Sequence, residues 1–197
     1  MRVAVRLGQA ALVVLLLAAA FGVWRATRAV PSSAVPAASL PADLVLGPDG
    51  IGRLRLGMSE QAALDTGESS VKPGWQKQHD SKCFSETTAG KVNVMFSSHH
   101  GLAVLSGPER TRTPEGIRAG ATVADVAVAY PTIMHPDLGT AAEQVELIGN
   151  VNVPVPGNPA AIYVFFFRLG SADPATARLQ VILLSLLDQD QECTRAD

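Results

Sequence analysis

The segment Ile51–Gly67, IGRLRLGMSEQAALDTG, constrains the fold most, because the chain repeats it loosely at Pro114–Pro131 as PEGIRAGATVADVAVAYP. With Gly57 placed on Gly120, an arginine between two apolar residues lies two positions before each glycine, and a hydroxyl residue lies two positions after it. This pattern predicts a duplicated unit. Capped helices after a glycine are also common in unrelated chains, and only the arginine and the glycine are identical between the copies.

Each copy predicts a short extended segment followed by a helix. Ser59 and Thr122 are suited to cap the two helices, because a hydroxyl oxygen can accept a hydrogen bond from a free backbone N–H of the first turn. Asp125 lies three residues after Thr122, which is the spacing of a capping box. The first helix should end at Gly67, and the second at Tyr130, because the proline that follows disfavours a helical residue before it.

Composition indicates a folded chain and argues against nucleic-acid binding. Hydrophobic residues make up 47% of the 197 residues and charged residues only 17%, so the chain can bury a substantial core. Four of its 16 basic residues lie within the first 30 positions, which leaves 12 basic against 18 acidic residues, a net charge of −6, in the remainder. Phosphate binding needs a basic surface, and this acidic remainder does not favour one.

Residues 1–29 have the pattern of a signal peptide or a signal anchor. Two arginines precede Leu7–Trp24, an uncharged and mostly apolar stretch. Cleavage would have to follow Ala29 or Ala37, and neither site is well placed. The length approaches that of a spanning helix, which favours an uncleaved anchor over a secreted product. Because the positive charges before the stretch outnumber those after it, the domain is expected outside the membrane in either case.

The region after the apolar stretch divides into a linker and a domain. Residues 30–42 are rich in Pro, Ala and Ser without periodicity, which is typical of an extended spacer. The domain is predicted to cover 43–197, with repeat one at about 51–113 and repeat two at about 114–193. Near its start, the sequence Gly-Pro-Asp-Gly at 47–50 predicts a turn.

Each repeat is predicted to add three strands to its helix. The expected strands are Cys83–Thr87, Lys91–Ser97, Gly101–Ser106, Gln144–Val153, Ala161–Leu169 and Arg178–Leu187. The last two are apolar at nearly every position, which indicates strands buried on both faces at the centre of a sheet. Three prolines within Val151–Pro159 favour an edge position or a bulge. The fold class is therefore α+β: two tandem helix-plus-antiparallel-sheet repeats after an N-terminal hydrophobic helix.

Cys83 and Cys193 are the two cysteines of the chain. In an oxidising compartment outside the cell we expect them to form a disulfide that ties the end of repeat two to repeat one. Closing a loop of this size would contribute about 4 to 5 kcal/mol in the chain-entropy model. Two buried thiols, or a bridge between molecules, are the alternatives.

No catalytic, metal or cofactor motif stands out in the sequence. The histidines and serines lack the spacing of metal ligands or of an activated nucleophile, so no metal, cofactor or catalytic residue is assigned. Trp75, in a Lys-Pro-Gly-Trp loop, is the one candidate binding residue, because interface hot spots favour tryptophan. It could equally fold back over the core. Arg55 and Arg118 are the best repeated polar positions, and solvent exposure is the simpler interpretation of both.

The two repeated phrases resemble sequences found in a group of uncharacterised secreted or envelope-attached proteins of high-GC Gram-positive bacteria, from about Leu46 to the end of the chain. The phrase LRLGMSEQAALDTG is more distantly similar to the helix start of the β-lactamase inhibitory protein family. That resemblance implies a tandem α+β architecture and protein binding across a concave sheet. Members of that family have a disulfide within each repeat, whereas this chain has one cysteine in each, so no inhibitory activity or contact residue is carried over.

Together these features predict an extracytoplasmic, non-enzymatic binding module for a protein or a cell-envelope component. It would be attached to the membrane through residues 7–24 if that stretch is uncleaved, or secreted if it is cleaved. Two other classes stay open: a small cell-envelope enzyme with no recognisable motif, and a structural subunit of an envelope complex. A large apolar face would favour the binding module.

Overall fold

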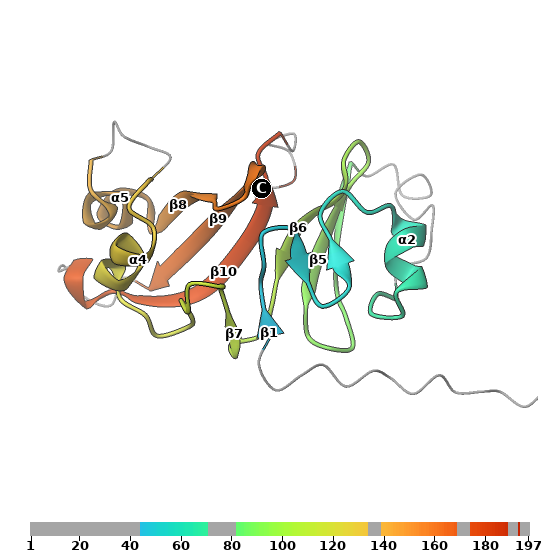
Figure 1. The fold of residues 1–197 in the computed structure, drawn as a ribbon, viewed down its shortest axis with the longest axis horizontal. Helices are drawn as coiled ribbons and strands as arrows, with labels where there is room; N and C mark the ends of the chain where they lie inside the picture. Colours follow the sequence, from blue (N-terminus) through green and yellow to red (C-terminus); the bar gives the residue numbers. More distant parts are fainter. Residues whose placement is uncertain (1–43, 71–81, 134–138, 169–173, 189–192, 194–197) are drawn as a thin grey trace, which may run out of the picture. The chain divides into compact units, whose positions relative to one another are not determined.

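A computed structural model of the chain describes residues 44–70, 82–133, 139–168, 174–188 and 193 (Figure 1). The predicted signal or anchor segment, the linker and Trp75 lie outside these residues. Among the described residues, no helix combines the length and the apolar character that crossing a membrane requires.

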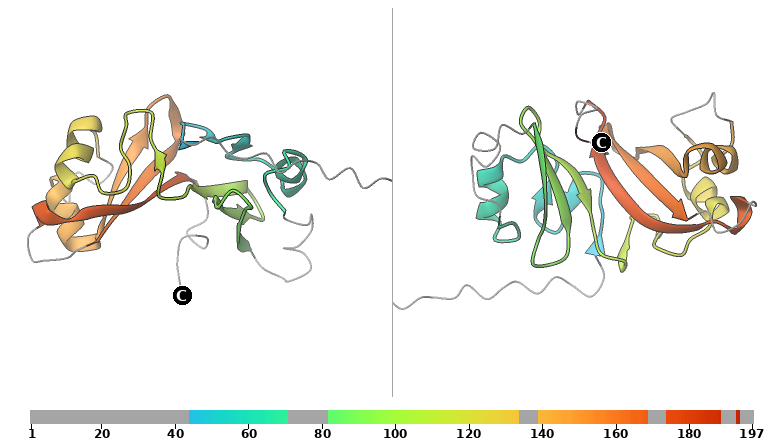
Figure 2. Two further views of the ribbon diagram at one scale, coloured as in Figure 1. Left: turned by 90° about the horizontal axis from the view of Figure 1, so that it is seen from below. Right: turned by 180° about the vertical axis from the view of Figure 1, so that it is seen from behind.

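The described residues form an α+β structure around one six-stranded antiparallel sheet with the strand order β4-β5-β6-β10-β9-β8 (Figure 1). Three strands come from before residue 107: β4 (Cys83–Thr87), β5 (Asn93–Ser97) and β6 (Gly101–Ser106). Three come from after it: β8 (Asn150–Val155), β9 (Asn158–Arg168) and β10 (Arg178–Leu186). Each set is a meander, and the two sets join where β6 pairs with β10. Figure 2 shows these two strands side by side.

The two predicted helices are confirmed, together with their caps. Helix α2 (Glu60–Asp65) begins after Ser59, whose hydroxyl accepts from the backbone N–H of Ala62. Helix α4 (Val123–Ala129) begins after Thr122, which forms a complete capping box with Asp125, and it ends at Tyr130 as the following proline requires. Gly67 follows α2 at a φ of +72°, a left-handed conformation that suits glycine after a helix.

The start of the fourth predicted strand is wrong, because its first residues form a helix. The expected strand covered Gln144–Val153, but α5 spans Ala141–Ile148 and β8 begins only at Asn150. A second capping box, between Thr140 and Glu143, starts this helix, and Gly149 ends it at a φ of +71°. The prediction of an edge strand for the proline-rich stretch is confirmed, because β8 lies at the sheet edge with a register shift at Pro154.

Residues 44–55 at the start of the domain, which we call the strap, are bonded to the second set of strands. β1 (Leu44–Val45) pairs in parallel with β7 (Thr111–Arg112), and β2 (Gly50–Ile51) forms a hairpin with β3 (Leu54–Arg55). Between these strands, Leu46 donates its N–H to the carbonyl of Arg112 at 2.9 Å. Its own carbonyl accepts the hydroxyl of Tyr163 from β9, also at 2.9 Å. The strap is thereby fixed against the second set of strands.

The sheet has two different faces because side chains alternate along each strand. One face, which we call the covered face, packs against the helices and the strap, and its large side chains are fully buried: Val94, Phe96, Leu105, Tyr163, Phe165 and Leu184. Tyr130, at the end of α4, packs on Tyr163 and Phe165 with ring centroids 5.8 and 5.4 Å apart. The opposite face, which we call the open face, is formed by the alternate residues of the same strands.

The third strand of each set has the same local geometry. In β6, Leu102 exchanges backbone hydrogen bonds with Gly57 and Met58, the residues that lead into α2. In β10, Leu179 does the same with Gly120 and Ala121, the residues that lead into α4. One residue after each leucine, at Ala103 and at Gln180, the register shifts by a β-bulge. Each leucine pairs with a phenylalanine of the neighbouring strand: Phe96 and Phe167.

Gly101 is required where β6 passes the chain before α2, and Gly101→Ala should lower the free energy of unfolding by about 2 kcal/mol or more. Its φ is +67°, and an added Cβ would lie 2.4 Å from the carbonyl oxygen of Met58. Gly116→Ala is the matched control, because that glycine has a φ of +90° but open space around it. The control should lose about 1 kcal/mol in urea unfolding. Equal losses would mean that the close contact has no effect.

The predicted disulfide between Cys83 and Cys193 is present, with a Cα–Cα distance of 5.4 Å. Cys83 is the first residue of β4 and pairs with Ser97 of β5, whereas the next residue, Phe84, stacks on Phe96 of the covered face. Because side chains alternate, Cys83 belongs to the open face. The bridge therefore attaches residue 193, which follows the last strand, to the first strand of the sheet.

Gln144 of α5 is a source of instability, and Gln144→Leu should raise the free energy of unfolding by about 1 to 2 kcal/mol. The side chain is 0% exposed, and neither its Nε2 nor its Oε1 has a hydrogen-bond partner in the described part of the chain. Urea unfolding would measure the change. Gln180→Leu, at an exposed glutamine, should change stability by less than about 0.5 kcal/mol. A loss of stability in Gln144→Leu would contradict the prediction.

Candidate binding face

The strand register places three pairs of side chains in a row on the open face. Across β9 and β10, Arg168 lies opposite Arg178, Phe166 opposite Val181, and Val164 opposite Leu183. Directly opposite residues have Cβ atoms about 5 Å apart, so each pair forms one contiguous surface. The bulge at Gln180 sets this arrangement, because it shifts the register between Leu179 and Val181. We call Phe166, Val181, Val164 and Leu183 the apolar strip.

The apolar strip is exposed at the end nearer the arginines. Phe166 is 40% exposed and Val181 41%, whereas Phe165, the neighbour of Phe166 on the covered face, is 0% exposed. The prediction that both strands are buried on both faces is therefore wrong for this pair, although β9 and β10 do lie inside the sheet. Both side chains belong to the exposed large hydrophobic residues of the described part of the chain.

Polar side chains border the apolar strip on its β8 side. Asn150 pairs with Phe166, and Asn152 pairs with Val164. The amide nitrogen of Asn150 donates to the side-chain oxygen of Asn152 at 3.2 Å. On the other side, Ser106 of β6 pairs with Leu183. An apolar centre with a polar border is the usual composition of a protein-binding surface.

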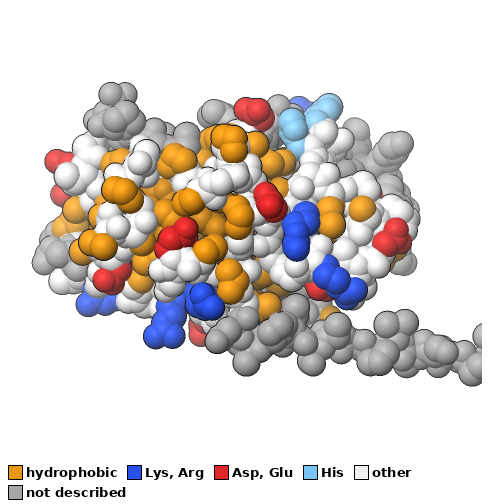
Figure 3. All heavy atoms as spheres, in the orientation of Figure 1, with side chains coloured by type: hydrophobic (Ala, Val, Ile, Leu, Met, Phe, Trp, Pro, Cys, Tyr) orange, Lys and Arg blue, Asp and Glu red, His pale blue; other side chains and the backbone are white. Residues whose placement is uncertain are grey.

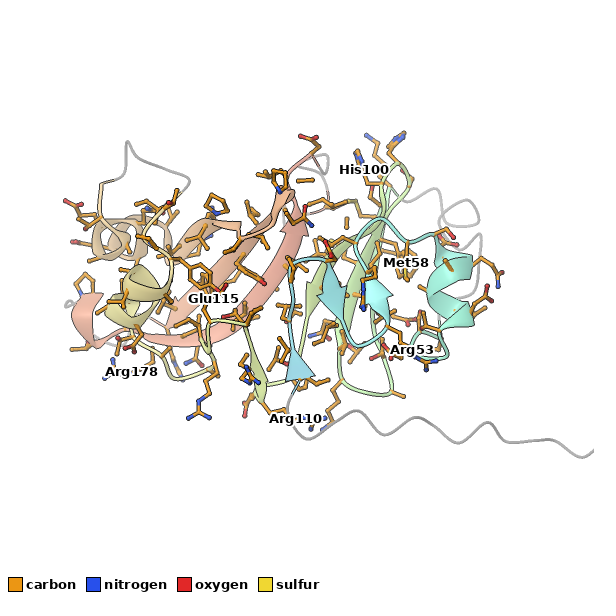
Figure 4. All side chains as sticks on the ribbon, in the orientation of Figure 1. Arg53, Met58, His100, Arg110, Glu115 and Arg178 are labelled. Atoms are coloured by element: carbon orange, nitrogen blue, oxygen red, sulfur yellow. A yellow bond between two sulfur atoms is a disulfide. The ribbon has the colours of Figure 1, made fainter. Side chains whose placement is uncertain are left out.

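The two arginines at the exposed end differ in how they are bonded. Arg168 is exposed and makes no side-chain hydrogen bond or ion pair within the described residues. Arg178 donates from Nη1 to the carbonyls of Thr176 and Ala177 at 3.0 and 3.2 Å. Figure 4 shows Arg178 beside α4, along the lower edge where Figure 3 shows Lys and Arg side chains gathering.

Arg178 also interacts with a carboxylate of α4. The backbone and hydroxyl hydrogen bonds of Thr122 lower the pKa of Asp125, and the nearby Arg178 guanidinium lowers it further. Arg178 is therefore partly compensated by Asp125, whereas Arg168 has no such partner in the described residues. Two like charges directly opposite in a sheet are unfavourable, so this pair is not explained by the stability of the sheet.

Within the described residues, the other side chains considered in the sequence do not assemble into a chemical site. Trp75 lies outside the described residues. The adjacent His99 and His100 contact each other edge to face with ring centroids 6.5 Å apart. Within the described ranges, no group of three His, Cys, Asp or Glu side chains is arranged to hold a metal ion. Cys83 and Cys193 are both used by the disulfide, so neither is a free nucleophile.

The repeated arginines face solvent, and the serines Ser69 and Ser70 make structural hydrogen bonds. Arg55 is exposed and donates from Nη1 to the carbonyl oxygen of Gly52 at 2.6 Å, and Arg118 is also exposed. Ser69 and the backbone N–H of Ser70 both donate to the carboxylate of Glu86, at 2.9 and 3.0 Å. These bonds attach the chain after α2 to β4, so the contacts of the two serines are structural.

Two buried tyrosines have shifted pKa values for structural reasons. Burial raises the pKa of the Tyr130 hydroxyl, and its hydrogen bond to the Glu115 carboxylate raises it further. Burial also raises the pKa of Tyr163, with the charges of Glu115 and Asp49 adding to the effect. Both hydroxyls therefore stay protonated near neutral pH, and each donates a hydrogen bond that holds the covered face together.

Two open grooves in the described part of the domain are lined mainly by polar or small residues. The larger, of about 810 Å³, runs along Thr87, Lys91, Asn93 and Glu109–Arg110. The smaller, of about 460 Å³, runs along Glu115–Ala121 and Asp125. Figure 4 shows Arg110 and Glu115, one residue from each groove. Neither lining includes a Ser, Cys or His side chain.

Comparison with models of protein families, with curated proteins and with solved structures finds no match to this chain. Sequence reasoning nominated Trp75 and missed Phe166 and Arg168. A signal for these two does exist in YVFFFR, because an arginine two positions after a phenylalanine places a charge and an aromatic ring on one face of a strand.

Proposed function

We propose that the protein is an extracytoplasmic, non-enzymatic binding module that docks a protein partner on the open face of its sheet. The observation that carries this proposal is the Phe166–Val181 pair, in which two large apolar side chains on adjacent interior strands are each about two-fifths exposed. A contiguous exposed group of large apolar side chains is typical of an interaction site.

The shape and chemistry of the open face favour a protein over a small molecule. The apolar strip lies on a sheet surface and is bordered by Asn150, Asn152 and the two arginines. Small ligands bind in concave pockets that surround most of their surface. An apolar centre with a polar and charged border suits a partner protein whose own apolar side chains cover Phe166 and Val181.

We also propose that the domain arose by duplication of a helix-plus-three-strand unit, behind an N-terminal hydrophobic helix. Support comes from the matched hydrogen bonds of Leu102 and Leu179 and from the bulges one residue after each of them. The helix of each unit begins after a hydroxyl cap, which is Ser59 in the first unit and Thr122 in the second. α5 has no counterpart among the described residues of the first half. A tandem arrangement of this kind is what the resemblance to the β-lactamase inhibitory protein family implies.

The proposed location is the outer side of the cell membrane or the extracellular medium. The Cys83–Cys193 bridge supports it, because stable disulfides form mainly in oxidising compartments. The apolar stretch at residues 7–24, with arginines before it, supports export. Fractionation of the source cells would test the location, and recovery of the native protein from the cytosol would overturn it.

The binding proposal is tested by site-specific photocrosslinking in the source cells. A photoreactive phenylalanine analogue replaces Phe166 in one version and Val128 of α4 in another. Val128 is 84% exposed, so it reports contacts that any accessible apolar side chain would make. We expect one defined protein to crosslink at position 166 and not at position 128.

The captured protein is then purified, and its Kd is measured with the unmodified chain and with Phe166→Ala. We expect the substitution to weaken binding by about tenfold or more, because a central aromatic residue commonly dominates an interface. Absence of any adduct at position 166, or an affinity unchanged by Phe166→Ala, would overturn the proposal.

A further inference from the structure

We propose that the partner presents an acidic segment, whose carboxylates pair with Arg168 and Arg178 while its apolar side chains cover Phe166 and Val181. This inference rests on the proposed function and specifies the chemistry of the partner. It follows from the register of β9 and β10, which places the two arginines directly opposite each other and next to the exposed end of the apolar strip.

The register brings two like charges to facing positions of the sheet. Arg168 and Arg178 are Cα partners in the β9–β10 ladder, and like charges in a cross-strand pair are destabilising. Arg168 has no hydrogen-bond or ion-pair partner among the described residues, and Asp125 compensates only Arg178. A bound carboxylate would remove this repulsion and would supply acceptors for Arg168.

The chemistry of arginine selects the class of partner. The guanidinium group is planar and can donate two parallel hydrogen bonds to one carboxylate. Two arginines at paired positions of neighbouring strands match a segment with two acidic residues close together. Next to them, Phe166 and Val181 need apolar side chains, which a purely anionic ligand such as free phosphate does not have. An Asp- or Glu-containing protein segment with aromatic or aliphatic neighbours satisfies both requirements.

The two arginines should contribute unequally. Nη1 of Arg178 already donates to the carbonyls of Thr176 and Ala177, and this arginine interacts with Asp125. The side chain of Arg168 makes no hydrogen bond or ion pair within the described residues. We therefore expect Arg168→Gln to weaken binding more than Arg178→Gln, and the double substitution to remove most of the preference for acidic ligands.

The test is selection of random 12-residue peptides displayed on phage against the full-length oxidised protein, with counter-selection on Phe166→Ser. The remaining peptides depend on the open face. We expect them to be rich in Asp and Glu next to apolar residues, to bind about tenfold or more weakly to the double Arg168→Gln and Arg178→Gln variant, and to bind more weakly as salt rises. Arg110→Gln, at another exposed arginine, is the control and should leave their affinity unchanged.

The outcomes separate the inference from the proposed function. Peptides that depend on Phe166 but contain no excess of acidic residues, or bind the double variant equally well, would overturn the acidic partner and leave the binding face intact. Failure to select any peptide that depends on Phe166 would count against both. Vesicles of phosphatidylglycerol and of phosphatidylcholine are tested in parallel. Binding to phosphatidylglycerol alone that is lost in the double variant would identify a membrane surface as the ligand, and it would overturn the inference.

Discussion

Phe165→Ala should lower the free energy of unfolding by about 3 to 5 kcal/mol, because it removes a large side chain from the core and leaves a cavity. Phe165 is 0% exposed and contacts both Tyr130 and Tyr163, with ring centroids 5.4 and 5.9 Å away. These aromatic contacts connect the end of α4 to the covered face. The measurement is urea unfolding of the oxidised protein followed by circular dichroism.

Phe166→Ala is the matched control for this prediction, since it changes the same residue type at the adjacent position of the same strand. Phe166 is 40% exposed, so its removal should cost about 1 kcal/mol or less. The two variants should therefore affect different properties. Phe165→Ala should reduce stability, and Phe166→Ala should reduce partner binding. Similar losses of stability in both would mean that the two faces of β9 are equally buried, which would contradict the proposed binding face.

Loss of the Cys83–Cys193 bridge is the second change expected to have a large effect. The two cysteines are 110 positions apart, and opening a loop of that length should cost about 4 to 5 kcal/mol in the chain-entropy model. For a domain of this size that corresponds to a drop in Tm of roughly 10 to 15 °C. The comparison is between the oxidised chain and the double variant Cys83→Ala, Cys193→Ala, by thermal unfolding.

A reducing agent provides the control for this second prediction. It should lower the Tm of the natural sequence by a similar amount and leave the double variant unchanged. An oxidised chain no more stable than the double variant would show that the bridge does not stabilise the domain. A reducing agent that also destabilised the double variant would point to an effect unrelated to the disulfide.

The sequence predicted the local elements that depend on neighbouring residues. Ser59 and Thr122 cap α2 and α4 as expected, and the strands Cys83–Thr87 and Gly101–Ser106 have their predicted bounds. Helix α5 was missed although Thr140 and Glu143 have capping-box spacing. The apolar residues that follow can belong to a short helix or to a buried strand, and their pattern does not distinguish the two.

The candidate site depends on register, which a single sequence does not reveal. The run from Tyr163 to Phe167 is apolar at every position, so alternation within the run cannot say which phenylalanine is exposed, and the one local signal is Arg168 two positions after Phe166. The bulge at Gln180 changes the alternation within β10 and places Val181 opposite Phe166. The side-by-side arginines likewise follow from the pairing of two strands. Long-range pairing of this kind determines the open face, whereas capping and turn residues determine the helices.

The attachment of the strap also decides how the domain would respond to mechanical load. Tension on residues before Leu44 enters the domain at β1, whose two residues pair in parallel with β7. The pairing of β1 with β7 is therefore the first contact of the domain to bear such a load. The next hydrogen bonds along the chain are those from Leu46 to Arg112 and from Tyr163 to Leu46. A force applied at the N-terminal end is thus passed to β9, the strand that carries Phe166 and Arg168.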